Sequence, residues 1–496
     1  MYLYGKTEIL RWDSEIAMTT RTVLRALAPR WRRIVRGFQS RAEHTAWARE
    51  VVRTRMLRPE GMGSVGSDAV PFLVDTSSGA FLIDHLKIEA MPASSRLDAT
   101  PAAASIQATW PITSNSLVAD QVSDFCQTDY KTSWARTFRL ARFYEALDAL
   151  TADVAYTYTD GLDKGLVLVT GGHYHSLKLR RTMPTADVTL RSYVTSAGGG
   201  ASMEVRTDLV QTDPATGEEV LIQCCHTAMV ALDKESRRPA KDAVPTLVIG
   251  DGDAAAAARL ALAARHKEYR KKQNQEAINL RAPISSPPTP SEMSGIHELW
   301  RSATALAEQR GPRVEKPETI AHHTHHKAVI VYPESRNLAG NTFGGFVMAQ
   351  AHDLAHYAAR YFVRGAPLAP FGLDEAVFHQ PVSVGDMASF TAKVVHCGTD
   401  GVFRVFVTVG IVDPHDPERA PQRTNRLLFT FATSPEAAPT LLPTTYSEIL
   451  MYTEGARRHD VEGLALDDAS LEQLNAFFGT FDREDAMGQP LGRRRR

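Results

Sequence analysis

Residues 184–214 read PTADVTLRSYVTSAGGGASMEVRTDLVQTDP, and residues 383–414 read SVGDMASFTAKVVHCGTDGVFRVFVTVGIVDP. Each segment has the pattern of one strand, a glycine-containing turn and a second strand. Each second strand ends in Asp-Pro, and the two Asp-Pro pairs lie 200 residues apart, at 213–214 and 413–414. Because self-similarity at a fixed spacing marks an internal repeat, the sequence predicts two copies of one structural unit.

Further elements of the same kind flank both segments in the same order. A third apolar strand follows each pair, at 220–232 and 426–433. A long helix precedes each pair, at 137–158 and 343–362, with apolar residues near helical spacing. One long helix followed by long antiparallel strands, occurring twice, predicts an α+β protein in which each sheet wraps its own helix.

The composition between the repeats indicates where the domains meet. A charged helical run at 267–275 and the Pro- and Ser-rich segment at 281–294 are typical of a linker. We therefore predict a presequence at 1–41, an N-terminal extension at 42–111, a first domain at 112–245, a linker at 246–295, a second domain at 296–455 and a C-terminal tail at 456–496.

The bulk composition excludes several classes of protein. The 496 residues include 43% hydrophobic and 23% charged residues, which is the profile of a globular protein of more than one domain. The formal net charge of -1 gives no global attraction to nucleic acid or to an anionic membrane surface. No apolar run approaches the roughly 18 residues that a membrane-spanning helix needs.

Neither the cysteines nor the histidines have the spacing of a metal site. We expect the four cysteines, Cys126, Cys224, Cys225 and Cys397, to be reduced and mostly buried. The histidines between His322 and His326 lead into a predicted strand, where alternate side chains point apart. We therefore expect no metal and no separate cofactor.

An arginine-rich segment lies near the start of the chain. Residues 18–41 contain seven arginines and no acidic residue, which is the composition of a mitochondrial presequence. The alternative is an arginine-rich helix that binds an anionic partner. Glu8, Asp13 and Glu15 suit an import signal badly, so we hypothesise that translation begins at Met18.

The helix predicted at 343–362 opens with Gly344-Gly345. Two glycines at a helix start let a small group approach unpaired backbone N–H groups at the positive helix end, which is a potential oxyanion site. Asn337 upstream can orient a water or a carbonyl, and Asp353 within the helix is a candidate carboxylate. The alternative is that the glycines serve only helix packing.

The first helix lacks these glycines but carries two carboxylates, Glu145 and Asp148, on one face. Carboxylates on an otherwise apolar helix are candidate bases. The alternative is a pair of ionic links to Arg139 and Arg142.

Residues 139–148, RLARFYEALD, resemble the R-x-G-R-x-x-E-D-L-D signature of the mitochondrial double-hotdog (type II) acyl-CoA thioesterases, with Ala141 in place of Gly and Ala146 in place of the first Asp. The resemblance extends collinearly over about 112–458. It rests on the further segments GGASMEVRT (199–207), TAMVALDKESRRPA (227–240), PSEMSGIHELW (290–300), ESRNLAGNTFGGFVMAQAHDLA (334–355), FHQPVSVGD (378–386) and TYSEILMYTEG (445–455).

This resemblance implies a tandem hotdog fold and hydrolysis of acyl-CoA to free acid and coenzyme A in the mitochondrial matrix. It also implies a site shared between the domains, in which Asn337, Gly344 and Gly345 work with Glu145 or Asp148. A homo-oligomer, a trimer of double hotdogs, is the family's usual assembly.

A second, pseudo-symmetric site is expected to be weaker. It keeps Asp353, but Thr132, Arg139 and Leu140 occupy the positions of the Asn and the two glycines. We therefore predict one working site per chain, which Ala141 could impair by crowding the backbone. The rival hypothesis is an inactive hotdog protein that serves as a structural subunit of a mitochondrial assembly and uses its arginine-rich ends to contact RNA or proteins.

Overall fold

The structure is a computed structural model of the chain. The residues it describes are 87–90, 105–115, 118–119, 122–124, 137–161, 164–178, 186–248, 288–310, 319–337, 340–366, 368–416, 419–460 and isolated positions between 257 and 271. The predicted presequence, most of the predicted linker, Thr132, Cys126 and the tail after 460 lie outside them.

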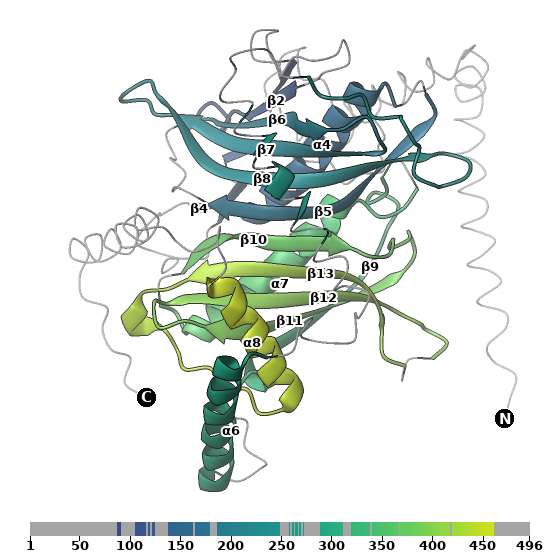
Figure 1. Ribbon diagram of the computed structural model, residues 1–496. Helices are drawn as coiled ribbons and strands as arrows, with labels where there is room; N and C mark the ends of the chain where they lie inside the picture. The colour runs from purple at the N-terminus through teal and green to yellow at the C-terminus, as the bar shows by residue number, and fades with distance from the viewer. Residues whose placement is uncertain are drawn as a thin grey trace, which may run out of the picture. The chain divides into compact units, whose positions relative to one another are not determined.

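One antiparallel sheet of eleven strands dominates the described residues, in the order β1-β2-β6-β7-β8-β5-β10-β13-β12-β11-β9 (Figure 1). Its first half comprises β1 (Lys87–Ala90), β2 (Ser105–Trp110), β5 (Leu166–Lys178), β6 (Val188–Ala197), β7 (Ser202–Thr212) and β8 (Glu219–Asp233). Its second half comprises β9 (Thr324–Ile330), β10 (Ala369–Phe378), β11 (Met387–Cys397), β12 (Val402–Val412) and β13 (Gln422–Ala432).

The strand order is symmetric about the join between β5 and β10, which pair antiparallel. Moving outward from this join, β5, β8, β7, β6 and β2 correspond to β10, β13, β12, β11 and β9. The hairpins predicted from the repeated segments are present as β6–β7 and β11–β12. The internal repeat inferred from the sequence is therefore a structural repeat.

Each half of the sheet packs against one long helix. Helix α4 (Leu140–Thr159) lies on the first half, and α7 (Gly344–Val363) lies on the second. The apolar positions of α4 that the sequence pattern selected, Phe143, Leu147, Leu150 and Val154, are fully buried. A sheet wrapped around its own helix, present twice, confirms the predicted α+β tandem hotdog.

Smaller elements complete the described part of the chain. The short strands β3 (Ser123–Asp124) and β4 (Thr137–Phe138) pair with each other. Helix α8 (Tyr446–Asp460) packs on β11, and α6 (Pro290–Arg310) packs on α8 through an ion pair between Arg457 and Glu292. No helix in this part is long and apolar enough to cross a membrane. The described cysteines, Cys224, Cys225 and Cys397, form no disulfide.

The structure differs from the sequence prediction in several places. Thr137 and Phe138 were expected to be helical but form β4, and α4 begins only after Arg139, whose N–H donates to the Val122 carbonyl. Strand β2 extends the first half of the sheet upstream of residue 112, and α6 begins inside the predicted linker. The domain boundaries themselves stay a prediction.

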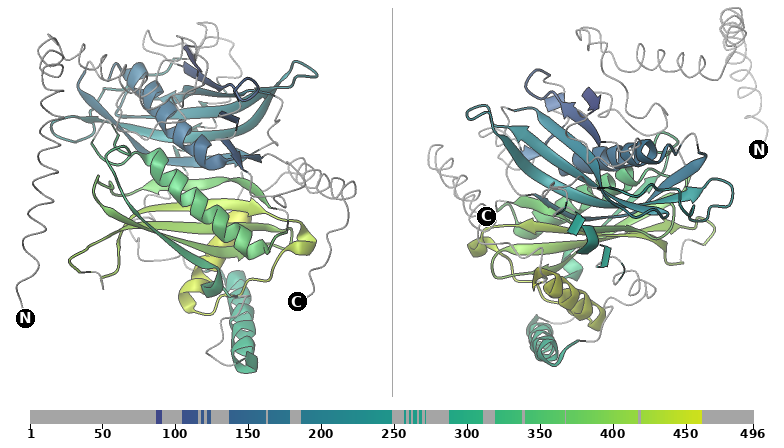
Figure 2. Two further views of the ribbon diagram at one scale, coloured as in Figure 1. Left: turned by 180° about the vertical axis from the view of Figure 1, so that it is seen from behind. Right: turned by 45° about the horizontal axis from the view of Figure 1, so that its top comes forward.

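The two long helices lie side by side on the same face of the sheet (Figure 2). Their backbones approach closely at Gly345, where an added Cβ would lie 2.9 Å from Cα of Glu145 and 2.6 Å from the Phe343 ring. A side chain at residue 345 would therefore force the helices apart, which gives this glycine a packing role.

This close approach predicts that Gly345→Ala lowers the free energy of unfolding by about 1–3 kcal/mol, the usual cost of overpacking a rigid contact. Gly295→Ala in α6 is the matched control, because nothing lies within 4 Å of its added Cβ. The control should stabilise its helix by about 0.5–1 kcal/mol. Urea denaturation measures both changes, and a Gly345→Ala protein as stable as the parent would contradict the packing described here.

Candidate active site

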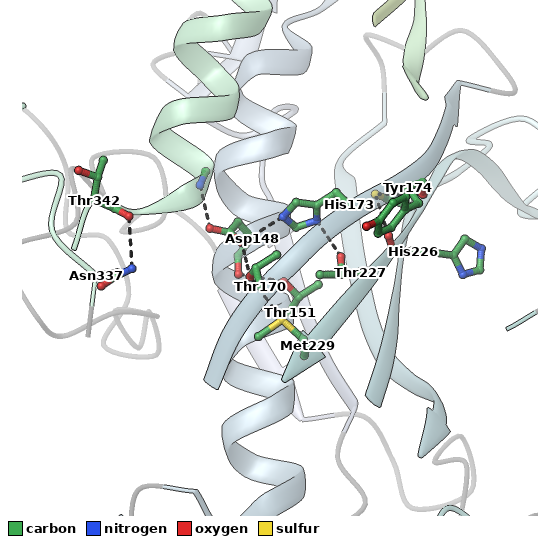
Figure 3. Close-up of polar contacts among 12 residues, drawn as sticks. Asp148, Thr151, Thr170, His173, Tyr174, His226, Thr227, Met229, Asn337 and Thr342 are labelled. Carbon is green, nitrogen blue, oxygen red and sulfur yellow. Dashed lines mark hydrogen bonds and ion pairs between the residues drawn. The ribbon is translucent and has the colours of Figure 1, made fainter. Parts of the chain in front are cut away.

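Asp148 lies in the middle of α4 and is 4% exposed. Its Oδ2 accepts a hydrogen bond of 2.8 Å from the backbone N–H of Gly345. Its Oδ1 accepts one of 3.0 Å from the hydroxyl of Thr170 and lies 3.1 Å from Nε2 of His173. Figure 3 shows Asp148 between the start of α7 and the β5 strand. Groups from both halves of the protein therefore hold this carboxylate in one orientation.

The start of α7 supplies the contact from the second half. The first N–H groups of a helix have no partner within the helix, and the helix dipole makes that end attractive to an anion. An added Cβ on Gly344 would lie 2.8 Å from Oδ2 of Asp148. Both glycines are thus needed for the carboxylate to reach the helix end, and the N–H of Gly344 has no hydrogen bond among the described residues.

Strand β5 supplies Thr170 and His173, which the sequence analysis did not select. Residues three apart on a regular strand point to opposite faces. The ladder between β5 and β8 shifts register between Thr170 and Gly172, so Gly171 is an extra residue and both side chains reach Asp148. In the sequence, the Gly171-Gly172 pair stands between Thr170 and His173 in an otherwise apolar strand, and this pattern could have identified both residues.

His173 is fully buried and is fixed at both ring nitrogens. Nε2 faces Asp148, and Nδ1 lies 2.8 Å from the hydroxyl of Thr227, its cross-strand neighbour. With its proton on Nε2, His173 donates to Asp148 and accepts from Thr227. The ring therefore supports the carboxylate from the side opposite to α7.

Glu145, the other predicted carboxylate, occupies a different environment. Its carboxylate forms a 2.7 Å ion pair with Arg142, and burial raises its pKa while Arg142 opposes that shift. It is not among the residues that line the cavity beside Asp148. For Glu145 the structure therefore shows the ionic link that the sequence offered as the alternative to catalysis.

Asn337 lies in the loop before α7 and stabilises that loop. Its Nδ2 donates to the Thr342 carbonyl over 3.3 Å, and its Oδ1 accepts from the Asn341 N–H over 3.0 Å. It also lines the cavity beside Asp148. The predicted residues Asn337, Gly344 and Asp148 are thus brought to one cavity, and Gly345 contacts Asp148 directly.

This cavity has a volume of about 470 Å³ and is bounded by both halves of the protein. Its first-half wall includes a stripe of α4 at helical spacing, formed by Asp148, Ala152 and Tyr156. Its second-half wall is more polar and includes Asn337, Thr342, Gly344, Phe378, His379 and Asn425. A carboxylate and a helix-start N–H beside a cavity are the elements needed to activate water against a bound carbonyl compound.

A partly exposed ion pair occupies the pseudo-symmetric position. Arg139 corresponds to Gly344, and its guanidinium lies 2.6 Å from Oδ2 of Asp353. Asp353 therefore contacts a cationic side chain where Asp148 contacts a backbone N–H. Ala141 is buried in the first turn of α4, beside Arg139, and does not line the cavity of Asp148. The methyl group of Ala141 therefore does not crowd the cavity of Asp148.

The comparisons with known proteins identify relatives of this chain, although no family model matches it. It is 27% identical over 348 residues to mouse (Mus musculus) mitochondrial acyl-coenzyme A thioesterase 10, covering 65% of this chain and 71% of the relative. It is 24% identical over 333 residues to mitochondrial acyl-coenzyme A thioesterase 4 of Humulus lupulus, covering 65% of this chain and 60% of the relative.

Solved structures with similar parts include the acyl-CoA hydrolase of Staphylococcus aureus, at 19% identity and a TM-score of 0.27 over 34% of this chain and 98% of that one. They also include the 12:0-ACP thioesterase of Umbellularia californica, at 10% identity and a TM-score of 0.35 over 62% of this chain and 92% of that one. These TM-scores and identities are too low for the role of any residue in those structures to be carried over to this chain. By its sequence relatives, the chain is a homologue of the mitochondrial acyl-coenzyme A thioesterases.

Proposed function

We propose that this protein hydrolyses acyl-CoA thioesters to free acid and coenzyme A, at one site per chain and without a cofactor. The observation that carries the proposal is the buried Asp148 carboxylate, hydrogen-bonded across the two halves to the start of α7 and facing a cavity. The named activity of the sequence relatives supports the choice of a thioester as substrate.

In the proposed reaction, Asp148 takes a proton from a water molecule as the water oxygen attacks the thioester carbonyl. The free N–H of Gly344 and the dipole of α7 stabilise the negative charge that develops on the carbonyl oxygen. The carbon–sulfur bond then breaks, and the leaving thiolate takes up the proton. Thr170 and His173 keep the carboxylate oriented during these steps.

This mechanism predicts that Asp148→Asn lowers kcat by about 10²- to 10⁴-fold, the usual contribution of a general base. Asp353→Asn is the matched control, since Asp353 occupies the pseudo-symmetric position and is paired with Arg139. The control should keep its rate within about threefold. Release of the coenzyme A thiol, measured with acyl-CoAs of several chain lengths, reports both rates.

Two outcomes would contradict the proposal. Equal losses of kcat in Asp148→Asn and Asp353→Asn would show that the two sites are equivalent, and would contradict one working site per chain. A correctly folded parent protein with no turnover of any chain length would refute the enzymatic function and favour the structural-subunit hypothesis.

We propose the mitochondrial matrix as the location, on the basis of the arginine-rich segment at 18–41 and the mitochondrial names of the relatives. Residues 18–41 fused to a fluorescent protein should accumulate in mitochondria, and replacing Arg30, Arg32 and Arg33 with Glu should abolish this because import signals require positive charge. Fluorescence microscopy checks the result, and a cytosolic parent fusion would contradict it. The trimeric assembly implied by the family resemblance stays a prediction.

A further inference from the structure

Three polar atoms on the second-half wall of the cavity take no part in the proposed chemistry. They are Oδ1 of Asn425, Oγ1 of Thr342 and Nε2 of His379. The three residues line the cavity, and these three atoms are covered and have no hydrogen-bond partner among the described residues. Asn425 is 3% exposed and Thr342 is 7% exposed. Buried polar atoms are nearly always hydrogen-bonded in folded proteins, so three unpaired atoms on one cavity wall indicate the place of a polar ligand group.

The strand register places Asn425 next to the proposed reaction centre. Asn425 on β13 stands directly opposite Phe378 on β10, and opposite residues of an antiparallel pair project from the same face. The Phe378 ring lies 3.3 Å from the position of an added Cβ on Gly344, and it meets His173 edge-on with ring centroids 6.0 Å apart. The side chain of Phe378 alone therefore separates Asn425 from Gly344 at the start of α7. It likewise separates Asn425 from His173, the hydrogen-bond partner of Asp148.

The other two groups are held in the same region by the backbone. His379 follows Phe378, and its N–H donates to the Thr424 carbonyl, next to Asn425. The N–H of Thr342 donates to the Val382 carbonyl, three residues beyond His379. Burial is the main cause of a lowered pKa at His379, with Arg426 acting in the same direction. A neutral imidazole and a hydroxyl can each donate one hydrogen bond.

The chemistry of the substrate identifies which part these atoms fit. A simple fatty acyl chain carries no N–H donor, so it cannot satisfy the acceptor oxygen of Asn425. The coenzyme A side of the thioester does carry one, because its pantetheine arm contains a secondary amide two carbons from the sulfur. In a trans amide the N–H and the carbonyl point in opposite directions, so a complete site needs an acceptor on one side and a donor on the other.

We propose that Asn425 is a substrate-positioning residue whose Oδ1 accepts the N–H of the pantetheine amide nearest the thioester. The hydroxyl of Thr342 or the imidazole of His379 donates to the carbonyl of the same amide. This inference rests on the proposed thioesterase function and assigns the polar second-half wall to the thiol side of the substrate. The apolar stripe of α4, through Ala152 and Tyr156, is left for the acyl side.

A pair of small substrates tests this assignment. The first is an acyl thioester of N-acetylcysteamine, which keeps only the amide nearest the sulfur. The second is the same acyl thioester of 2-acetoxyethanethiol, in which an ester oxygen replaces the amide N–H. The full-length parent protein should hydrolyse the amide compound with a kcat/KM about tenfold above that of the ester, mostly through KM, because the missing donor leaves a buried acceptor unpaired.

The variant Asn425→Ala should reduce that ratio to about one, by lowering kcat/KM for the amide substrate and leaving the ester substrate within twofold. Arg423→Ala, at an exposed position of the same strand that does not line the cavity, is the control and should keep the tenfold ratio. If Asn425→Ala does not fold, equal hydrolysis of both substrates by the parent protein still overturns the inference.

The outcomes separate this inference from the proposed function. A parent protein that hydrolyses both substrates equally would overturn the role of Asn425, and so would an Asn425→Ala protein that keeps the tenfold ratio. Equal losses on both substrates in Asn425→Ala would show a merely structural role. No hydrolysis of acyl-CoA itself by the parent would instead refute the proposed function.

Discussion

The hydrogen bond from the N–H of Gly345 to the carboxylate of Asp148 joins the two halves of the protein at the start of α7. It requires the backbones of α4 and α7 to approach more closely than side chains allow, which is why glycine occupies residues 344 and 345. The pairing of β5 with β10 joins the two half-sheets at the same boundary. The cavity, the polar wall around Asn425 and the orientation of the carboxylate all depend on this contact.

Because the fold is repeated, a carboxylate from one long helix could meet the start of the other helix at two places. The side chains at these two places differ. At one site a glycine leaves room for Asp148 to reach a backbone N–H. At the other, Arg139 stands in place of the glycine and its guanidinium contacts Asp353. A carboxylate already paired with a flexible cation contributes to packing between the halves and is poorly placed to take a proton from water. The fold is therefore symmetric while the chemistry it supports is not.

Patterns within single segments predicted most of the fold. The helical spacing of Phe143, Leu147, Leu150 and Val154 and the glycine turn of β6–β7 depend only on neighbours in sequence, so they could be read directly. Strand β2 was missed because its six residues carry little periodicity of their own and are held by pairing with β6, some eighty residues later. The family resemblance that the sequence suggested is confirmed by the relatives.

The candidate site could be predicted only in part. The glycine pair, Asn337 and the two carboxylates were recognisable as residue types, but Glu145 and Asp148 share a helix face, and only the crossing of α7 distinguishes them. Thr170 and His173 reach Asp148 because of one extra strand residue, and Asn425 depends on a cross-strand register. Strand register arises from tertiary pairing, which no local pattern in this chain revealed, whereas the Gly171-Gly172 pair was a local signal of the bulge.

The central claim is that each chain has one working site, built by Asp148 from the first half and the start of α7 from the second. Its most direct test is the binding stoichiometry of a non-hydrolysable acyl-CoA thioether, measured by isothermal titration calorimetry on the folded protein. The account predicts one equivalent bound per chain. Two equivalents of similar affinity per chain would contradict it, because the site of Arg139 and Asp353 would then be open as well.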